Sequence, residues 1–261
     1  MAQKDLKFSD ETLLELLKQR HTLYEIMNIL GVCKSTVARR MKKLGVSTFD
    51  YKLDVTVFDS IDTEEKAYWL GFMFADGYVS KRYTVSLTLK ESDRSHVERF
   101  ARFFNIRKIH IGKGTAKLNN KEYRYCRWGI QNKHLHDTLC SLGCVQNKSL
   151  ILKFPKKEIF KDQRLIYDFI RGYVDGDGCL WLNKQDTLIL EIMGTTEFLK
   201  ELQSYFPNKF TFGHKDKRRP NSNTYRLIAC SQNAKDVTNK LYKNATIYLE
   251  RKYLKYKIGV S

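Results

Sequence analysis

The sequence predicts an α+β protein in which two similar halves follow a small all-α domain. Helical periodicity with a glycine-containing turn fills the first 46 residues, and a fixed order of helices and strands occurs twice after residue 61. In addition, 42% of the 261 residues are hydrophobic, which is enough to bury a sizeable core. We expect a helix-turn-helix domain over 1–46, a linker over 47–61, a first repeat over 62–157 and a second repeat over 158–261.

The charge balance points to a polyanionic partner. The chain has 47 Lys and Arg against 29 Asp and Glu, a net charge of +18, and nucleic acid is the first candidate for such a basic protein. The alternative is a basic protein without this partner. No apolar run approaches the roughly 18 residues of a membrane span, and the first residues lack a signal-peptide pattern. Six irregularly spaced cysteines indicate reduced thiols. We therefore expect a soluble intracellular protein without a membrane partner.

The first 46 residues contain three short amphipathic helices. Ser9 can cap the first, a second covers about 23–30, and Gly31 begins a turn into a third over about 34–44. A tight glycine-containing turn between two helices is typical of a helix-turn-helix. The third helix is basic, and its outward residues can reach bases and phosphates of DNA. The alternative is a small bundle with a solvated basic face. The predicted DNA-binding residues are Lys34, Ser35, Thr36, Arg39 and Arg40.

The internal repeat after residue 61 is weak in identity but clear in order. In the first half a strand over 83–90 alternates strictly and places Val85, Leu87 and Leu89 on the core side. A helix over 93–104 and a hairpin over 109–130 follow. The second half has a strand, a helix, two strands and a helix over 187–192, 197–205, 210–214, 224–230 and 233–241.

The helix that opens each repeat is the most informative segment of the sequence. The first ends Tyr68-Trp-Leu-Gly-Phe-Met-Phe-Ala-Asp-Gly77, and the second ends Phe169-Ile-Arg-Gly-Tyr-Val-Asp-Gly-Asp-Gly178. Each carries two small residues four positions apart, Gly71 with Ala75 and Gly172 with Gly176. Residues i and i+4 share a helix face, so each helix has a stripe without side-chain bulk. Two such stripes can meet backbone to backbone.

Parallel packing of these helices would place their C-terminal acids, Asp76 and Asp177, side by side. Adjacent carboxylates at helix C-termini are unfavourable unless a cation lies between them. Hard oxygen ligands favour Mg²⁺, and a divalent ion there can support phosphodiester hydrolysis. The predicted metal site comprises Asp76, Asp177 and the residues before them, Ala75 and Gly176. Mn²⁺ or Ca²⁺ can occupy the same sites.

These two segments resemble the paired motifs of LAGLIDADG homing endonucleases, in the single-chain form that has two motifs. The resemblance covers about residues 62–258. It implies a saddle of antiparallel strands over the DNA major groove, with αββαββα repeats and the motif helices at a pseudo-twofold axis. It also implies metal-dependent cleavage of both strands of a long double-stranded DNA site, leaving 3′ overhangs. The metal-binding acids of the family correspond to Asp76 and Asp177. Asp175 matches an earlier acidic position of the motif, where the first segment has Phe74.

The resemblance also implies basic residues near the metals. Lys148, ahead of the second motif helix, matches a segment that bears an active-site lysine, and Lys252 holds the corresponding place after the second repeat. The predicted catalytic residues are therefore Asp76, Asp177, Lys148 and Lys252. A lysine beside the scissile phosphate would stabilise developing charge.

On the same resemblance, outward strand positions and hairpin loops read DNA. Serine, threonine, glutamate and basic side chains suit mixed base and phosphate contacts. The candidates in the first repeat are Thr84, Ser86, Thr88, Lys90 and Arg127. The candidates in the second repeat are Thr187, Glu191, Thr224 and Arg226, with Lys215, Lys217, Arg218 and Arg219 at phosphates.

These inferences predict a site-specific homing endonuclease that acts as a monomer, without an obligate protein partner, in the cytoplasm or the DNA-containing compartment of its cell. Pseudo-twofold symmetry within one chain predicts an asymmetric target. Two alternatives stay open. One is a non-cleaving transcription regulator on the same scaffold, and the other is a maturase that assists splicing of intron RNA.

Overall fold

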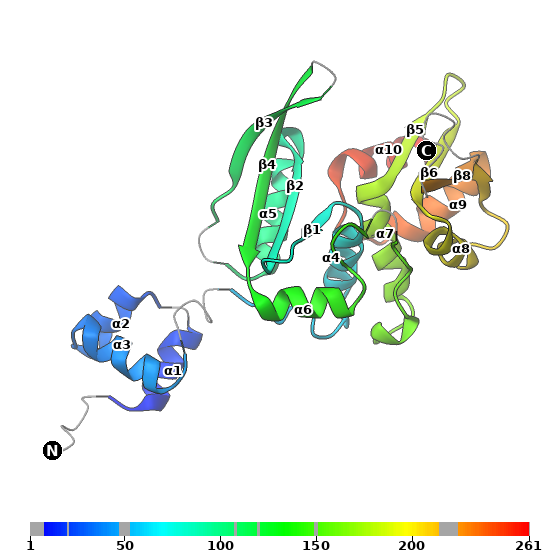
Figure 1. Cartoon of the computed structure of the whole chain (residues 1–261). Helices are drawn as coiled ribbons and strands as arrows, with labels where there is room; N and C mark the ends of the chain where they lie inside the picture. Colours follow the sequence, from blue (N-terminus) through cyan, green and yellow to red (C-terminus); the bar gives the residue numbers. More distant parts are fainter. Residues whose placement is uncertain are drawn as a thin grey trace. The chain divides into compact units, whose positions relative to one another are not determined.

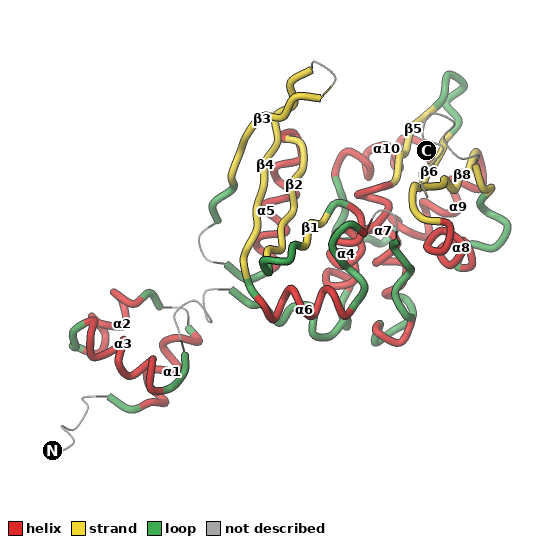
Figure 2. Tube along the Cα trace, in the orientation of Figure 1, coloured by secondary structure: helices red, strands yellow, loops and turns green. Residues whose placement is uncertain are grey.

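Figure 1 shows the computed structural model, which describes residues 8–19, 21–46, 53–106, 109–118, 121–148, 151–213 and 224–260. The chain divides into two compact units, each of which contains two stretches of sequence. The first unit is Met1–Val55 with Phe104–Ile109, and the second is Thr56–Phe103 with His110–Ser261. Helices alone make up the regular structure described in the first unit, whereas the second combines helices and strands (Figure 2).

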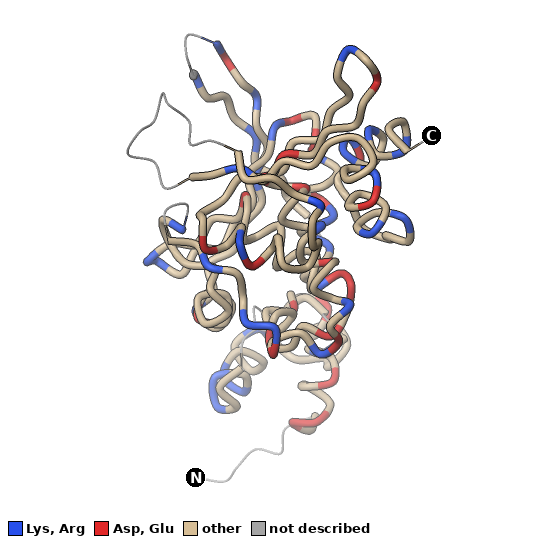
Figure 3. Tube along the Cα trace, turned by 90° about the vertical axis from the view of Figure 1, so that its right-hand side faces the viewer, with Lys and Arg blue, Asp and Glu red and all other residues tan. Residues whose placement is uncertain are grey.

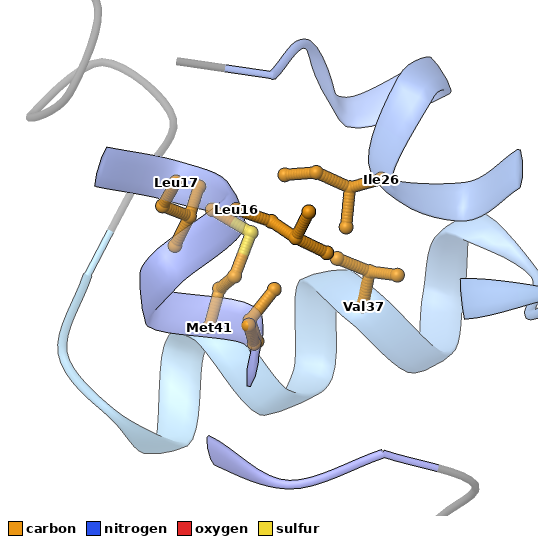
Figure 4. Packing of buried hydrophobic residues seen from close by; sticks show 6 residues of the cluster. Leu16, Leu17, Ile26, Val37 and Met41 are labelled. Atoms are coloured by element: carbon orange, nitrogen blue, oxygen red, sulfur yellow. The ribbon is translucent and has the colours of Figure 1, made fainter. Parts of the chain in front are cut away.

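The first unit is built from α1 (Asp10–Lys18), α2 (Leu23–Leu30) and α3 (Lys34–Lys43). Ser9 caps α1 by accepting a hydrogen bond from the Thr12 backbone N–H at 3.1 Å. Gly31 ends α2 with a φ of +62°, a conformation that glycine adopts without strain. The helices share one apolar core (Figure 4), whose buried residues are Leu13, Leu16, Leu17, Ile26, Val37 and Met41.

The segment predicted as a linker, 47–61, is described only from residue 53. Its last part is packed rather than free, because Val57, Phe58 and Ile61 are buried. The ring of Phe58 lies 5.4 Å from that of Phe103, both in the second unit. These residues therefore contribute to the core of the second unit.

The second unit contains two repeats of the same order. The first consists of α4 (Glu64–Ala75), β1 (Gly77–Val79), β2 (Thr84–Lys90), α5 (Arg94–Phe103), β3 (Gly112–Leu118), β4 (Lys121–Gln131) and α6 (Lys133–Ser141). The second consists of α7 (Leu165–Asp177), β5 (Gly178–Leu182), β6 (Leu188–Thr195), α8 (Thr196–Ser204), β7 (Thr211–Gly213), β8 (Thr224–Cys230) and α9 (Ser231–Tyr242). This confirms the predicted α+β fold class with two αββαββα repeats.

Each repeat forms a four-stranded antiparallel sheet, and the two sheets have equivalent strand orders, β1-β2-β4-β3 and β5-β6-β8-β7. Helices α5 and α6 pack on the first sheet, and α8 and α9 pack on the second. Helices α4 and α7 pack against each other, between the two sheets (Figure 1). An additional helix that the repeat pattern does not predict, α10 (Glu250–Val260), packs on β5 and α9.

None of the described helices combines the length and apolar character that crossing a lipid bilayer requires.

Candidate functional site

Helices α4 and α7 meet backbone to backbone at their glycines. A Cβ atom added to Gly71 would lie 1.9 Å from the Phe169 carbonyl oxygen, and one added to Gly172 would lie 1.9 Å from that of Tyr68. Farther along, a Cβ on Gly176 would lie 2.3 Å from the Cβ of Ala75. These contacts are related by a pseudo-twofold axis. They confirm the predicted packing through the small-residue stripes.

This packing brings Asp76 and Asp177 together at the C-terminal ends of the two helices. Asp76 is the C-cap of α4, and Asp177 is the last residue of α7. Both residues are exposed to solvent, yet enough protein lies around their carboxylates to remove part of their hydration. Removal from bulk water and repulsion by Asp76 raise the pKa of Asp177 to about 6. Removal from bulk water likewise raises the pKa of Asp76, against the charges of Lys252 and Lys148.

The two predicted lysines hold equivalent places at the ends of these helices. Lys148 is half-buried, and its ammonium donates to the Gly77 carbonyl at the end of α4. Lys252 is only 2% exposed and donates to the carbonyls of Val174, Asp175 and Gly178 at 2.6–2.7 Å. Lysine at a helix C-terminus satisfies carbonyls that lack intrahelical partners. Lys252 also lies 3.3 Å from the carbonyl oxygen of Gly176. Gly176 is one of the residues predicted to form the metal site.

Lys252 stays a predicted catalytic residue, and the structure shows that its side chain is buried against the end of α7. Burial lowers its pKa to about 8, although the charge of Asp175 opposes this shift. Its hydrogens point at carbonyl oxygens of α7, so its direct effect is on the helix end that carries Asp177. Its charge also lowers the pKa values of both acids.

Asp175 belongs to a buried network that the sequence did not reveal. Its carboxylate is fully buried and accepts from the hydroxyls of Tyr68 at 2.7 Å and Tyr242 at 2.6 Å, and from the Leu249 N–H at 2.6 Å. The Tyr68 oxygen also lies 3.0 Å from Nε2 of His96. This acid therefore faces the interior, away from Asp76 and Asp177. Its partners are 67 to 107 residues away in the sequence, so no local pattern could identify them.

A second buried network joins the repeats near the beginning of α4. The Arg171 guanidinium is buried and donates to Glu64 at 2.7 Å. Glu64 in turn accepts from the backbone N–H and the hydroxyl of Thr246, both at 2.8 Å. Arg171 also donates to the Ile247 carbonyl at 2.9 Å. The two motif helices are thus tied by charge at this end and by glycine contacts along their crossing.

The donor set at the helix ends suits a hard divalent cation. The two carboxylates are close enough that Asp76 raises the pKa of Asp177, and a cation between them would remove this repulsion. Among the described residues, no three His, Cys, Asp or Glu side chains cluster in a way that could hold a metal. An ion here would therefore take its other ligands from backbone oxygens, water or a bound phosphate.

The outward strand residues of the first sheet lie around a groove of about 740 Å³ that begins at Asp76. Thr84, Thr88 and Arg127, which are predicted to bind DNA, line this groove, and Lys90 is exposed on the same strand face. Ser86 also lines it but is only 1% exposed, because it accepts a 3.0 Å hydrogen bond from Arg127. Ser86 thus orients Arg127 instead of projecting. The groove has further lining residues that sequence patterns missed: Tyr78, Ser80, Lys81, Arg82 and Gln146.

In the second sheet, Asp177 lines a smaller cavity of about 190 Å³ together with Lys148, Met193 and Thr224. Arg226 and Glu191 share the outward face and form an ion pair at 3.4 Å. Thr187 is partly exposed just before β6. The predicted loop residues Lys215, Lys217, Arg218 and Arg219 lie outside the described residues.

In the first unit, α3 exposes Lys34, Ser35 and Arg39, and Thr36 is partly exposed. Arg40 differs from the expectation of an outward, DNA-facing side chain. Its guanidinium forms a bidentate ion pair with Asp10 of α1, and its side chain is only 18% exposed. The helical periodicity of the sequence cannot show that Arg40 forms an ion pair with Asp10, because the two residues are 30 positions apart.

Two solved structures of homing endonucleases are similar to this chain. The homing endonuclease I-WcaI bound to its DNA recognition sequence has 11% sequence identity and a TM-score of 0.53, covering 74% of this chain and 87% of its own. The meganuclease I-SmaMI bound to uncleavable DNA has 13% identity and a TM-score of 0.45, covering 73% and 87%. The fold comparison rests on the first of these. No family model and no curated protein matches the chain. With its duplicated repeats, equivalent sheets and glycine-packed helix pair, the chain has the fold of a single-chain, two-motif LAGLIDADG homing endonuclease.

Proposed function

We propose that the chain is a site-specific endonuclease that cuts both strands of duplex DNA by divalent-metal-dependent hydrolysis. One observation carries the proposal: Asp76 and Asp177 converge at the ends of two closely packed helices, between two sheets of equivalent order. The fold shared with I-WcaI, which is bound to its DNA recognition sequence, supports the same function. The net charge of +18 suits a polyanionic substrate.

Asp76 and Asp177 would hold the cation, preferably Mg²⁺, which would activate water and stabilise the leaving oxygen. Lys148 and Lys252 keep the two helix ends in place by binding their carbonyl oxygens, and they add positive charge near the acids. Lys148, which is half-buried, is the lysine with access to a phosphate. Thr84, Thr88, Lys90 and Arg127 would contact one half of the DNA site, and Arg226 the other.

Because both half-sites are read by one chain, the active species would be a monomer on a long asymmetric target, and cleavage would leave short 3′ overhangs. The helix α3 would extend the contacted DNA through Lys34, Ser35, Thr36 and Arg39. This assigns additional DNA binding to residues 1–46, and both DNA binding and cleavage to the two repeats.

The test is cleavage of a plasmid that carries the uninterrupted sequence into which the gene is inserted. With Mg²⁺ we expect one double-strand cut, with 3′ overhangs on sequencing of the ends. Asp76→Asn and Asp177→Asn should each abolish the cut, whereas Asp137→Asn, at an exposed acid of α6, should retain it. Specific binding without cutting by the unaltered chain would overturn the nuclease and support the regulator.

A further inference from the structure

The two sheets expose chemically different faces at matching positions. Ser86 pairs with Tyr78 and Gly129, and in the second sheet Glu191 pairs in the same way with Cys179 and Ile228. Thr88 lies opposite Arg127, and Met193 lies opposite Arg226. The registers therefore allow the outward residues of the two halves to be compared one by one.

Apolar residues in the second sheet replace hydroxyls of the first. Met193 corresponds to Thr88, and Ile189 corresponds to Thr84. Trp181 pairs with Ile189, where Ser80 hydrogen-bonds to Thr84. Met193 is 45% exposed, and Ile189, Trp181 and Ile228 are partly exposed. The second sheet thus presents apolar side chains to the side that carries DNA-contacting hydroxyls in the first.

The outward face of the first sheet is also more positively charged than that of the second sheet. In the first sheet Lys90 and Arg127 leave a net positive face, and within the described part of the chain no carboxylate forms an ion pair with either of them. In the second, Arg226 is neutralised by Glu191 at 3.4 Å. The second face therefore offers less attraction to phosphate and more van der Waals contact surface.

We infer that the second repeat recognises its half-site through the 5-methyl groups of thymines, which Ile189 and Met193 contact. This inference rests on the proposed function and names the bases that one half of the site reads. The thymine methyl is the apolar group that base pairs display in the major groove. DNA is the occupant because Met193 lines the cavity beside Asp177, just as Thr88 lines the groove beside Asp76. The first repeat reads its half through hydroxyls and Arg127.

The experiment begins with selection of bound duplexes from a randomised DNA pool. The full chain with Asp76→Asn and Asp177→Asn is used in Mg²⁺, so that DNA is bound but not cut. In the sequence that emerges, each thymine is replaced singly by deoxyuridine, which removes only the methyl group. We expect each contacted thymine in one half-site to lose about fourfold in affinity, the effect of one buried methyl group.

The same substitutions are then measured with Ile189→Thr and Met193→Thr, which introduce the residues found at Thr84 and Thr88. Each variant should abolish the deoxyuridine penalty at its own thymine and leave the others unchanged. Thr84→Ser and Thr88→Ser in the first repeat are the matched controls and should leave all these penalties intact. Thermal melting of each variant verifies that it is folded.

The possible failures are distinguishable. A shared target whose thymines tolerate deoxyuridine, or whose penalties survive both threonine variants, overturns this inference and leaves the endonuclease proposal standing. A pool from which no shared sequence emerges overturns both. A concentration-dependent dimer that Met193→Thr dissociates, with DNA binding unchanged, would instead assign this face to a second copy of the chain.

Discussion

At the scale of single residues, the removal of Asp177 from bulk water and its repulsion by Asp76 make the stability of the protein depend on pH. The folded-state pKa of Asp177 is about 6, above the ordinary value for aspartate. Between roughly pH 4 and 6 the folded state therefore binds more protons than the unfolded state, so this group lowers stability as pH rises through that window.

We accordingly expect Mg²⁺ to raise the Tm more at pH 7.5 than at pH 5, where protonation of Asp177 already relieves the repulsion. Asp177→Asn should raise the Tm without metal and remove most of the Mg²⁺ effect. Scanning calorimetry at both pH values tests this. A Tm that does not change when Mg²⁺ is added at pH 7.5 would contradict the proposed ion site.

The two lysines should differ in their effect on stability because they differ in burial. Lys252→Met leaves three close carbonyls and the buried Asp175 without their cation, which should cost about 3 kcal/mol or more. Lys148→Met removes one carbonyl contact of a half-buried side chain and should cost about 1 kcal/mol. Urea unfolding measures both. Equal losses would show that the burial of Lys252 does not govern its role.

The sequence predicted the acids better than it predicted their surroundings. Asp76 and Asp177 follow from the spacing of small residues along two helices, which is local information. The burial of Lys252 and the pairing of Arg40 with Asp10 depend on partners brought in by tertiary packing. The same holds for Ser86, whose exposure is decided by the arginine of the neighbouring strand.

At the scale of elements, the crossing of α4 and α7 should tolerate no added side chain. Gly71→Ala or Gly172→Ala places a Cβ 1.9 Å from a main-chain oxygen, and the helices must separate to admit it. We expect a loss of about 3 kcal/mol or more in either variant, or failure to fold. Gly112→Ala is the control, because a Cβ there lies 3.5 Å from its nearest neighbour. Thermal unfolding of the three variants provides the measurement.

The strands and most helices were predictable because their periodicity is local. The predicted strands over 187–192 and 224–230 correspond to β6 and β8, and β6 continues to Thr195. Helix α10 was not predicted as an element because it has no counterpart in the first repeat. Its buried positions, Lys252, Tyr256 and Gly259, include a lysine and a glycine, so it lacks a simple apolar stripe.

At the scale of the whole molecule, the net charge of +18 should dominate the affinity for DNA. Each phosphate that the protein neutralises releases counterions, so the logarithm of the binding constant should fall with that of salt with a slope of about −5 or steeper. Fluorescence anisotropy with a duplex between low and high salt measures this slope. A flat dependence would contradict a phosphate-contacting surface.

Figure 3 shows Lys and Arg at the tip of the β5–β6 hairpin and along the β3–β4 hairpin, where such contacts would form.

The Arg171–Glu64–Thr246 network has a mechanical consequence for the two-repeat unit. It anchors the repeats to each other near the start of α4, while like charges push the opposite ends of α4 and α7 apart. Helices α4 and α7 are therefore held together by the ion pair near the start of α4, and the two acids lie at the other end of the helix pair. If the two acids bind an ion, as proposed, that ion would act at the end of the helix pair opposite the Arg171 network and would influence the spacing of the two sheets.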